Sequence, residues 1–310
     1  MDLLILVDSH VLSQALIVAT PILLASQGEL LIERSGTLNL SIEGMTTLGA
    51  VVGFLIANST GNNYLGILAA MLAVGSAGLV MGYLAISVRA SQLMAGLALF
   101  VFLMGLSSLL YRLVIGLLFV PPQIQTFSGM LNDGSTFPGD WLFKLPGPVY
   151  VVFLVVVLVH LLLFKTTIGL RIRACGENPR AAEVQGIPVF TVRYVTLFLG
   201  SVLIGAGGAL LPMLLTGTYT DGIAGGRGWI ALILVIFGRW YPFRALLGGL
   251  LFGYVEALQY SLLLTVKVIP SQFLLMVPYI FVILIAMRAY GGAQQAPKAL
   301  MKPYDREMRV

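Results

Sequence analysis

Five polar side chains stand within or beside apolar stretches long enough to cross a membrane: Asn39, Glu43, Gln92, Glu256 and Gln259. An ionised side chain at the centre of a bilayer costs about 2.5–3.5 kcal/mol on insertion scales, so such residues usually face the interior of a helix bundle. Asn39 and Glu43 are four residues apart, and Glu256 and Gln259 are three apart. Each pair therefore shares one face if its segment is helical. Such groups either contact a polar solute along a passage or hydrogen-bond neighbouring helices, and both interpretations fit the sequence.

The composition places these residues in a membrane protein. Of 310 residues, 58% are hydrophobic and 10% are charged, and the mean hydropathy is +0.97. A soluble domain has about 25% charged residues, because its folded surface must be wetted. We therefore predict an all-α polytopic integral membrane protein with about 8–10 transmembrane segments.

Nine stretches are candidates for these segments, because a span needs about 20 mostly apolar residues. They are 10–26, 42–58, 64–87, 92–114, 147–164, 192–215, 228–238, 244–264 and 271–288. The seventh is short and lies between glycines. It predicts a half-helix or a re-entrant segment, covered by protein or by a water-filled cavity. We expect a transmembrane domain over 1–290 and a cytoplasmic tail over 291–310.

The basic residues predict the orientation of the spans. They gather in the loop 165–193 and in the C-terminal tail, whereas the segment 115–146 is rich in proline and glycine and holds one lysine, Lys144. The positive-inside rule places the loop and the tail in the cytoplasm and the segment 115–146 outside the cell. The N-terminus then also lies outside.

The loop stretch GENPRAAEVQGIPV (176–189) contains the signals of one short helix. Asn178 is a favoured N-cap and Pro179 suits the first helical position, whereas Gly186 and Pro188 end the run. The pattern predicts a helix of about two turns, ~10 Å long, outside the membrane. Isolated helices of this length are marginal in water, so we expect this helix to pack on a partner surface.

Other functional classes lack their signals. One cysteine, Cys175, and two histidines, His10 and His160, stand apart, whereas a metal site needs clustered donors. We expect no metal, no other cofactor and no catalytic residue, and we expect packing roles for both histidines. No lysine follows a glycine, which excludes a Walker A phosphate loop. If ATP drives this protein, another subunit hydrolyses it. The net charge of +5 reflects membrane topology more than nucleic-acid binding.

Three stretches resemble the membrane-spanning permease subunits of bacterial ABC importers, in the branch that carries nucleosides and simple sugars. They are ERSGTLNLSIEGM (33–45), GENPRAAEVQGI (176–187) and GRGWIALILVIFGRWYPFRALLGGLLFGYVEALQ (226–259). The broader family includes ribose and branched-chain amino acid permeases, and the third stretch resembles the nucleoside type in particular. The resemblance spans nearly the whole chain.

The resemblance implies a type II importer-like permease bundle in the inner membrane of a bacterial cell. Its expected partners are two ABC ATPase subunits, a second related or identical permease subunit, an extracytoplasmic substrate-binding protein and membrane lipid, without nucleic acid. The second stretch would be the coupling helix that docks on an ATPase, and Ala181 and Ala182 are small enough for close docking. Its residues are Gly176, Glu177, Asn178, Pro179, Arg180, Ala181, Ala182, Glu183 and Gly186.

The first stretch would be the family's signature segment, beside the translocation path. Asn39, Glu43, Gln92, Glu256 and Gln259 are then candidates for lining or supporting that path. A nucleoside has hydroxyls and base edges but no net charge, so amides suit it better than a fixed charge. We therefore expect Gln92 and Gln259 to contact the solute and Glu43 to hold the signature segment against a neighbouring helix.

One position departs from this pattern, and other transporters fit part of the sequence. After SQLMAGLAL (91–99), nucleoside-type permeases often carry an asparagine near the position of Leu99 or Phe100, which bears on the solute. An ABC permease for a simple sugar or a branched-chain amino acid is one alternative. An ion-gradient-driven secondary transporter is another, because it also has broken helices and mid-membrane polar groups. It would not need the capped cytoplasmic helix.

Overall fold

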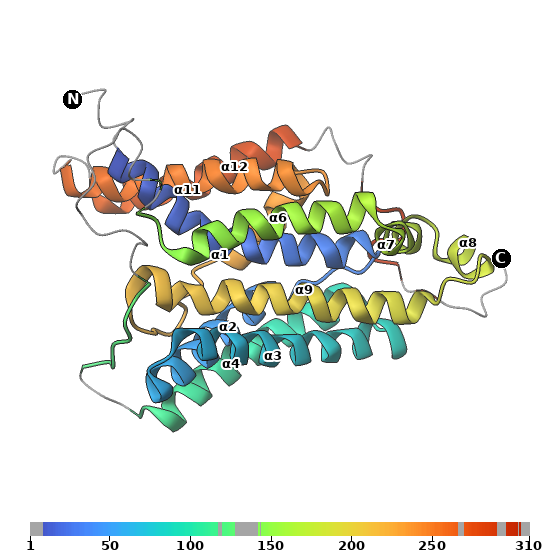
Figure 1. Cartoon of the computed structure of the whole chain (residues 1–310), viewed down its shortest axis with the longest axis horizontal. Helices are drawn as coiled ribbons and strands as arrows, with labels where there is room; N and C mark the ends of the chain where they lie inside the picture. The colour runs from blue at the N-terminus through green and yellow to red at the C-terminus, as the bar shows by residue number, and fades with distance from the viewer. Residues whose placement is uncertain are drawn as a thin grey trace.

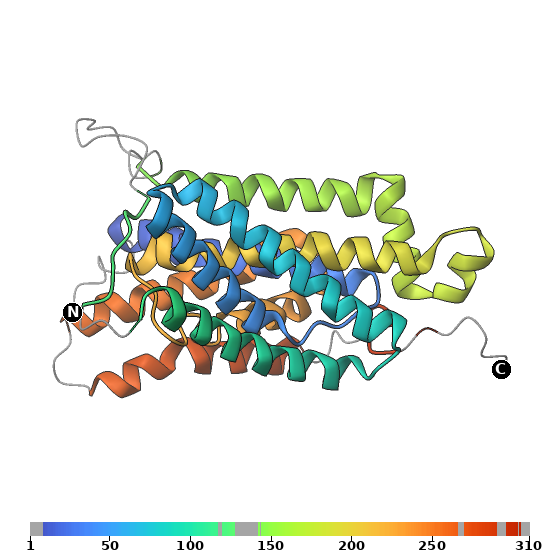
Figure 2. The same cartoon turned by 90° about the horizontal axis from the view of Figure 1, so that it is seen from below.

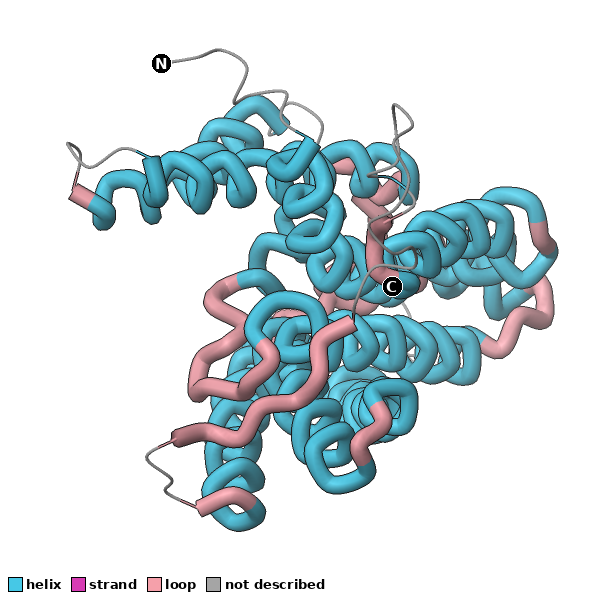
Figure 3. The backbone as a smooth tube through the Cα atoms, turned by 60° about the vertical axis from the view of Figure 1, so that its left-hand side comes forward, coloured by secondary structure: helices cyan, strands magenta, loops and turns pink. Residues whose placement is uncertain are grey.

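The structure is a computed structural model that describes residues 9–116, 120–127, 142, 144–265, 270–289, 296–302 and 304. Every regular element in these ranges is a helix (Figure 3). The α-helices are α1 (Ser9–Arg34), α2 (Ile42–Thr60), α3 (Asn63–Gly82), α4 (Gln92–Val114), α6 (Gly147–Lys165), α7 (Thr167–Glu177), α8 (Pro179–Val184), α9 (Val189–Leu211), α10 (Arg227–Phe237), α11 (Pro242–Thr265) and α12 (Ser271–Ala289). Two π-helical turns, η2 (Tyr83–Ser87) and η3 (Pro212–Thr216), continue α3 and α9.

Seven helical segments among the described residues are long and apolar enough to cross a membrane. They are α1, α2, α3 with η2, α4, α6, α9 with η3, and α11, and the apolar parts of α10 and α12 are shorter. The prediction of an all-α polytopic membrane protein is confirmed. α10 has 11 residues, which gives about 16 Å, half of a ~30 Å hydrocarbon core. It is the short helix that the glycine-bounded stretch predicted.

The long helices run in the same general direction, along the longest axis of the molecule (Figure 1, Figure 2). α7 and α8 project at one end, beside the described part of the C-terminal segment, and α1 begins toward the other end. At that other end, the backbone N–H groups of Ile124 and Phe127 donate to the carbonyls of Gly217 and Met213 at 2.8 and 2.9 Å. Most of the segment 115–146, and residues 291–295 and 305–310 of the tail, lie outside the described residues.

α9 packs directly on α1, α2 and α3 and joins the two halves of the bundle. A Cβ atom on Gly200 would lie 2.5 Å from the carbonyl oxygen of Gly28 in α1. One on Gly208 would lie 2.2 Å from the carbonyl oxygen of Thr46 in α2. Only glycine permits these backbone contacts. Such close approach gives membrane helices the van der Waals packing that holds them together.

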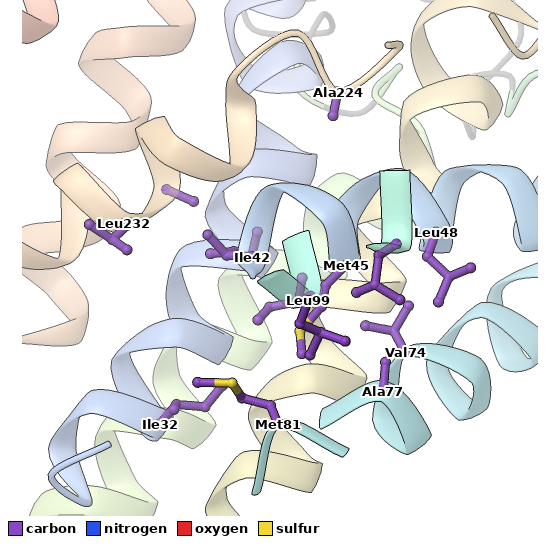
Figure 4. Close-up of a cluster of buried hydrophobic side chains, with 14 of the residues drawn as sticks. Ile32, Ile42, Met45, Leu48, Val74, Ala77, Met81, Leu99, Ala224 and Leu232 are labelled. Atoms are coloured by element: carbon purple, nitrogen blue, oxygen red, sulfur yellow. The ribbon is translucent and has the colours of Figure 1, made fainter. Parts of the chain in front are cut away.

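The largest apolar cluster surrounds the first turns of α2 (Figure 4). Ile42, Met45 and Leu48 are buried there with Val74 of α3 and Leu99 of α4. Leu99 occupies the position where the resemblance led us to expect a polar asparagine. Its side chain is 6% exposed and belongs to this cluster, so the departure from the pattern serves helix packing.

One local prediction is wrong. Asn39 lies in the non-helical segment 35–41 before α2, so Asn39 and Glu43 do not share a helical face. The Oδ1 atom of Asn39 accepts hydrogen bonds from the backbone N and the Oγ of Ser41, at 3.2 and 2.5 Å. Local bonds of this kind compete with helix formation. The turn itself passes through Gly36, whose φ of +87° favours glycine.

The short helix predicted within the loop 165–193 forms. α8 begins at Pro179, and the Oδ1 atom of Asn178 accepts a hydrogen bond from the Ala181 N–H at 3.1 Å. The chain leaves the helix before Gly186, whose φ is +79°. Local capping signals therefore determine both ends of this helix.

The histidines lie in different surroundings. His160 packs among the rings of Phe164, Tyr241 and Phe243, with centroids 5.2, 5.3 and 4.9 Å away. This confirms its predicted packing role. His10 lies in the first turn of α1 and lines a cavity described below.

The orientation can be tested with cysteines at two exposed positions in a Cys175→Ser background. Ser59, in the last turn of α2, lies at the predicted outer end, and Met301, with 51% of its side chain exposed, lies at the predicted inner end. A membrane-impermeant maleimide should label Ser59→Cys in intact cells and Met301→Cys only after lysis, because the basic loops stay in the cytoplasm. The opposite pattern would invert the topology.

Candidate functional site

The candidate site is centred on the start of the half-helix α10, where Glu43 of α2 meets its backbone. The two carboxylate oxygens of Glu43 accept hydrogen bonds from the N–H groups of Gly226 and Gly228, each at 2.7 Å. The first N–H groups of a helix have no partner within the helix, and the helix dipole favours a negative charge there. A Cβ atom on Gly228 would lie 2.6 Å from the Cα of Glu43, so only glycine lets the carboxylate come this close.

Asn39 is held by a second buried carboxylate, that of Glu29 in α1. Its backbone N and its Nδ2 donate to the two oxygens of Glu29 at 3.2 and 3.1 Å. Both side chains are 0% exposed. Asn39 is therefore bonded to α1 and to Ser41, and its amide serves the conformation of the signature segment, defined here as residues 33–45.

Gln92, the first residue of α4, also supports the signature segment. Its Oε1 atom accepts a hydrogen bond from the Leu38 N–H at 2.8 Å, and its side chain is 2% exposed. One turn further, a Cβ atom on Gly96 would lie 2.9 Å from the backbone N of Leu40. The start of α4 thus packs directly on this segment.

Glu256 and Gln259 lie on one face of α11 and are 6% and 4% exposed. The carboxylate of Glu256 forms an ion pair with the guanidinium of Arg227, the first residue of α10. Arg227 Nε and Glu256 Oε2 are buried without a hydrogen-bond partner among the described residues. α11 therefore reaches the same half-helix terminus as Glu43, through Arg227.

A cavity of about 680 Å³ opens beside this ion pair. Its wall comes from α1, η3, the chain before α10, and α11, and Arg227 forms part of it. Polar side chains in the wall are His10, Gln14, Thr216, Thr220, Tyr260 and Ser261. Small-molecule sites typically measure about 300–1,000 Å³ and combine apolar walls with a few polar groups. This cavity has the size and the chemistry to admit a small polar solute.

The other end of α10 is fixed by residues that the sequence did not single out as site residues. Arg239 and Trp240 both have positive φ, 52° and 56°, which is uncommon for residues with side chains. The Trp240 indole N–H donates to the Glu33 carboxylate, and the Trp240 carbonyl accepts from Arg34 Nε and Nη2 at 2.8 and 2.6 Å. Glu33 and Arg34 end α1, so α1 and α2 hold α10 at both of its ends. The sequence held one signal of this contact, because two ionisable residues, Glu33 and Arg34, follow an apolar run.

The predicted coupling residues form α8 and its flanks, and they divide between two faces. Asn178, Arg180, Ala181 and Val184 are exposed, and Val184 reaches 85%. Ala182 is 4% exposed and packs inward against Cys175 and Tyr304, so its expected place in a docking surface is wrong. Gly176 is buried against the Arg34 carbonyl, from which a Cβ atom would lie 2.2 Å.

The fold and the site define a polytopic membrane permease, because buried polar groups and a cavity surround a half-helix within a bundle of long apolar helices. The chain belongs to the family described as the branched-chain amino acid transport system permease component, which matches residues 11–286. Membership implies an ABC transporter with ATPase and substrate-binding partners. The helices make the chain a multi-pass protein of the cell inner membrane.

Three relatives are similar over nearly their whole length. The chain is 33% identical to a guanosine ABC transporter permease of Bacillus subtilis, covering 97% of this chain and 98% of the relative. It is 31% identical to a nucleoside ABC transporter permease of Lactococcus lactis (93% and 94% covered). It is 33% identical to a putative glucose ABC transporter permease of Haloferax volcanii (94% and 95% covered). No solved structure matches the chain.

Glu43 and Gln259 have different expected phenotypes, which follow for Glu43 from its bonds to the start of α10 and for Gln259 from the sequence-based expectation of solute contact. Hydrogen bonds to a charged group contribute about 1.5–3 kcal/mol. Glu43→Gln removes the charge and one of two acceptors, so we expect it to lower the free energy of unfolding by about 2 kcal/mol and to reduce the amount of folded protein. Gln259→Leu should leave that amount normal and lower transport. Protein abundance, thermal unfolding and uptake, measured for both variants, test this assignment, and the reverse pattern would show that the two roles are exchanged.

Proposed function

We propose that the chain forms the translocation path of an ATP-driven ABC importer and that its solute is a nucleoside. The observation that carries this proposal is the cavity beside Arg227. Its polar lining offers hydroxyl, amide and phenol groups, and the charge of Arg227 is balanced by Glu256. A wall of this kind suits an uncharged solute with many hydrogen-bonding groups. The names of the guanosine and nucleoside permeases support the same class.

A simple sugar is the second candidate, because it is also uncharged and rich in hydroxyls, and one relative bears a glucose permease name. Tyr260 and the apolar part of the wall favour a solute with a flat ring, which a nucleoside has and a sugar lacks. A branched-chain amino acid carries two charges that this wall does not match. Competition of unlabelled nucleosides, sugars and amino acids against uptake of a labelled nucleoside would rank the three classes.

The energy source in this proposal is a pair of ATPase subunits that dock on α8. The exposed side chains of Arg180, Ala181 and Val184 form the outer face of this helix. The 85% exposed side chain of Val184 leaves an apolar group at the centre of this face that another subunit could cover. A secondary carrier would have no use for such a face. A second permease subunit, related or identical, and an extracytoplasmic substrate-binding protein complete the proposed assembly.

The binding protein is expected to dock at the opposite end of the bundle. A hollow of about 670 Å³ lies there between the α2–α3 turn and the segment 123–127. Its lining is rich in amides, namely Asn58, Asn62, Asn63, Gln123 and Gln125. Asn63 Nδ2 donates to the Gln125 carbonyl at 2.7 Å, which ties the two parts of this surface together. A polar surface of this kind suits a transient protein contact.

Gln14 provides the test of the cavity. Gln14→Leu removes an amide from the wall without touching the Arg227–Glu256 pair, and one neutral hydrogen bond is worth about 1 kcal/mol. We expect the KM for nucleoside uptake to rise about fivefold at unchanged maximal rate and protein abundance. Gln272→Leu is the matched control, because Gln272 is an exposed glutamine of α12 away from the cavity. Equal KM values for Gln14→Leu and the unaltered protein would exclude this cavity from the path.

Val184 provides the test of ATPase docking. Val184→Asp places a charge on the exposed face of α8 and leaves the buried side of the helix intact. We expect ATP-dependent uptake in proteoliposomes with all partner subunits to fall at least tenfold, while membrane insertion stays normal. Val120→Asp is the control, because Val120 is 77% exposed at the opposite end of the bundle. Normal uptake by Val184→Asp would argue against the docking surface, and uptake without ATP would argue for a secondary carrier.

A further inference from the structure

The C-terminal segment folds back onto the base of α8. We use "C-terminal strap" for its described residues, 296–302 and 304. The backbone N–H of Ala299 donates to the Gly176 carbonyl at 2.9 Å, and Ala299 is 5% exposed. The last turn of α7 and the strap are therefore joined by a backbone hydrogen bond. Figure 1 shows the described part of the C-terminal segment, in red, beside α7.

Tyr304 makes the strap's main side-chain contacts. It is 6% exposed and belongs to an apolar cluster with Cys175, Ala182 and Val189. Its ring lies 5.7 Å from that of Phe190 at the start of α9. Its hydroxyl donates to the carboxylate of Glu183 in α8. One aromatic residue of the tail thus contacts α7, α8 and α9 together.

Arg193 connects the strap with the signature segment. Its guanidinium carbon lies 5.8 Å from the centre of the Tyr304 ring, and its Nε donates to the Ser35 carbonyl at 3.2 Å. A Cβ atom on Gly36 would lie 3.2 Å both from Ala299 Cβ and from Gly176 Cα. The strap, the α7–α8 corner and the turn before α2 therefore meet at one place.

We propose that the C-terminal strap fixes α8 against the bundle and that Tyr304 is a positioning residue for coupling. This inference rests on the proposed function in one respect, the assignment of α8 as the ATPase docking helix. A six-residue helix does not hold its orientation through its own hydrogen bonds, because helices this short are unstable alone. Ala182 is the one buried residue of α8, and its small side chain gives little apolar contact with the bundle. The strap supplies a further apolar contact for α8, and the Tyr304 hydroxyl donates a hydrogen bond to the Glu183 carboxylate.

Cys175 makes this proposal measurable without any transport assay. It is the only cysteine of the chain, it is 0% exposed, and it lies in the same cluster as Tyr304. Burial raises the pKa of the Cys175 thiol, and the nearby Arg193 charge opposes that shift. Because the thiolate is the reactive form, both shielding and the raised pKa keep labelling slow while the strap is in place.

The first experiment measures maleimide labelling of Cys175 in inside-out membrane vesicles. Tyr304→Ala should increase the labelling rate at least tenfold, because it removes the ring that covers the cluster. Tyr304→Phe keeps the ring and should leave the rate within about twofold, which separates local release from general unfolding. Tyr150→Ala is the control, because Tyr150 lies in the first turn of α6, at the other end of the bundle. An unchanged rate in folded Tyr304→Ala would overturn the strap.

The second experiment measures uptake per ATP hydrolysed in the assembled transporter. Tyr304→Ala should lower this ratio severalfold at unchanged KM for the solute, because it removes both the ring and the hydrogen bond to Glu183. Tyr304→Phe removes only that hydrogen bond, so it should lower the ratio less. A normal ratio in both variants would overturn the positioning role, even if Cys175 becomes accessible. If Val184→Asp also fails to lower uptake, the docking assignment itself has failed. The labelling result then still decides whether the strap exists.

Discussion

The bond between Glu43 and the start of α10 is the interaction on which the centre of this protein depends. A helix that begins inside a membrane bundle presents N–H groups that water cannot satisfy, and each one costs several kcal/mol if it stays unpaired. The Glu43 carboxylate accepts from two of them, at Gly226 and Gly228. The half-helix can therefore exist at this depth only while α2 stays in register with it. This constraint explains why the signature segment is rigidly supported by Glu29 and Gln92.

Buried contacts also link the end of the bundle that carries α7 and α8 to its polar centre. Tyr304 contacts α8 and Arg193, Arg193 bonds to Ser35, and the chain from Ser35 continues directly to Glu43. Tyr304, Arg193 and Ser35 are all buried, so little solvent separates α8 from the signature segment. This continuous packing gives a physical route by which a movement of α8 could reach α10. The element that changes conformation would be α10, because it is short and bounded by glycines. An ATPase subunit that moved α8, as proposed above, would act on α10 through Tyr304, Arg193 and the signature segment.

The sequence predicted the elements and missed their long-range partners. Apolar runs and the capping signals of Asn178 and Gly186 are local, so they predicted the apolar helices and α8. Of the nine predicted stretches, seven correspond to helical segments long enough to cross a membrane among the described residues. The spacing of Asn39 and Glu43 predicted a shared face on condition that their segment is helical, and spacing does not show that the Ser41 bond keeps Asn39 out of the helix. The partners of Glu43 and Trp240 are 183 and 207 residues away in sequence. Such contacts depend on which helices pack together. The periodicity of apolar residues along one segment does not show that.

The ion pair of Arg227 and Glu256 shows why this centre is adapted for more than stability. Burying two charges costs several kcal/mol each, and a well-packed apolar pair would often be as stable or more so. Here Arg227 Nε and Glu256 Oε2 have no hydrogen-bond partner within the part of the chain that the structure describes, and Arg227 helps to line the adjacent cavity. Structural stability alone would favour pairing these atoms. Arg227, with its charge balanced by Glu256, instead gives the cavity wall a neutralised polar group, which suits the uncharged solute proposed above better than an ion.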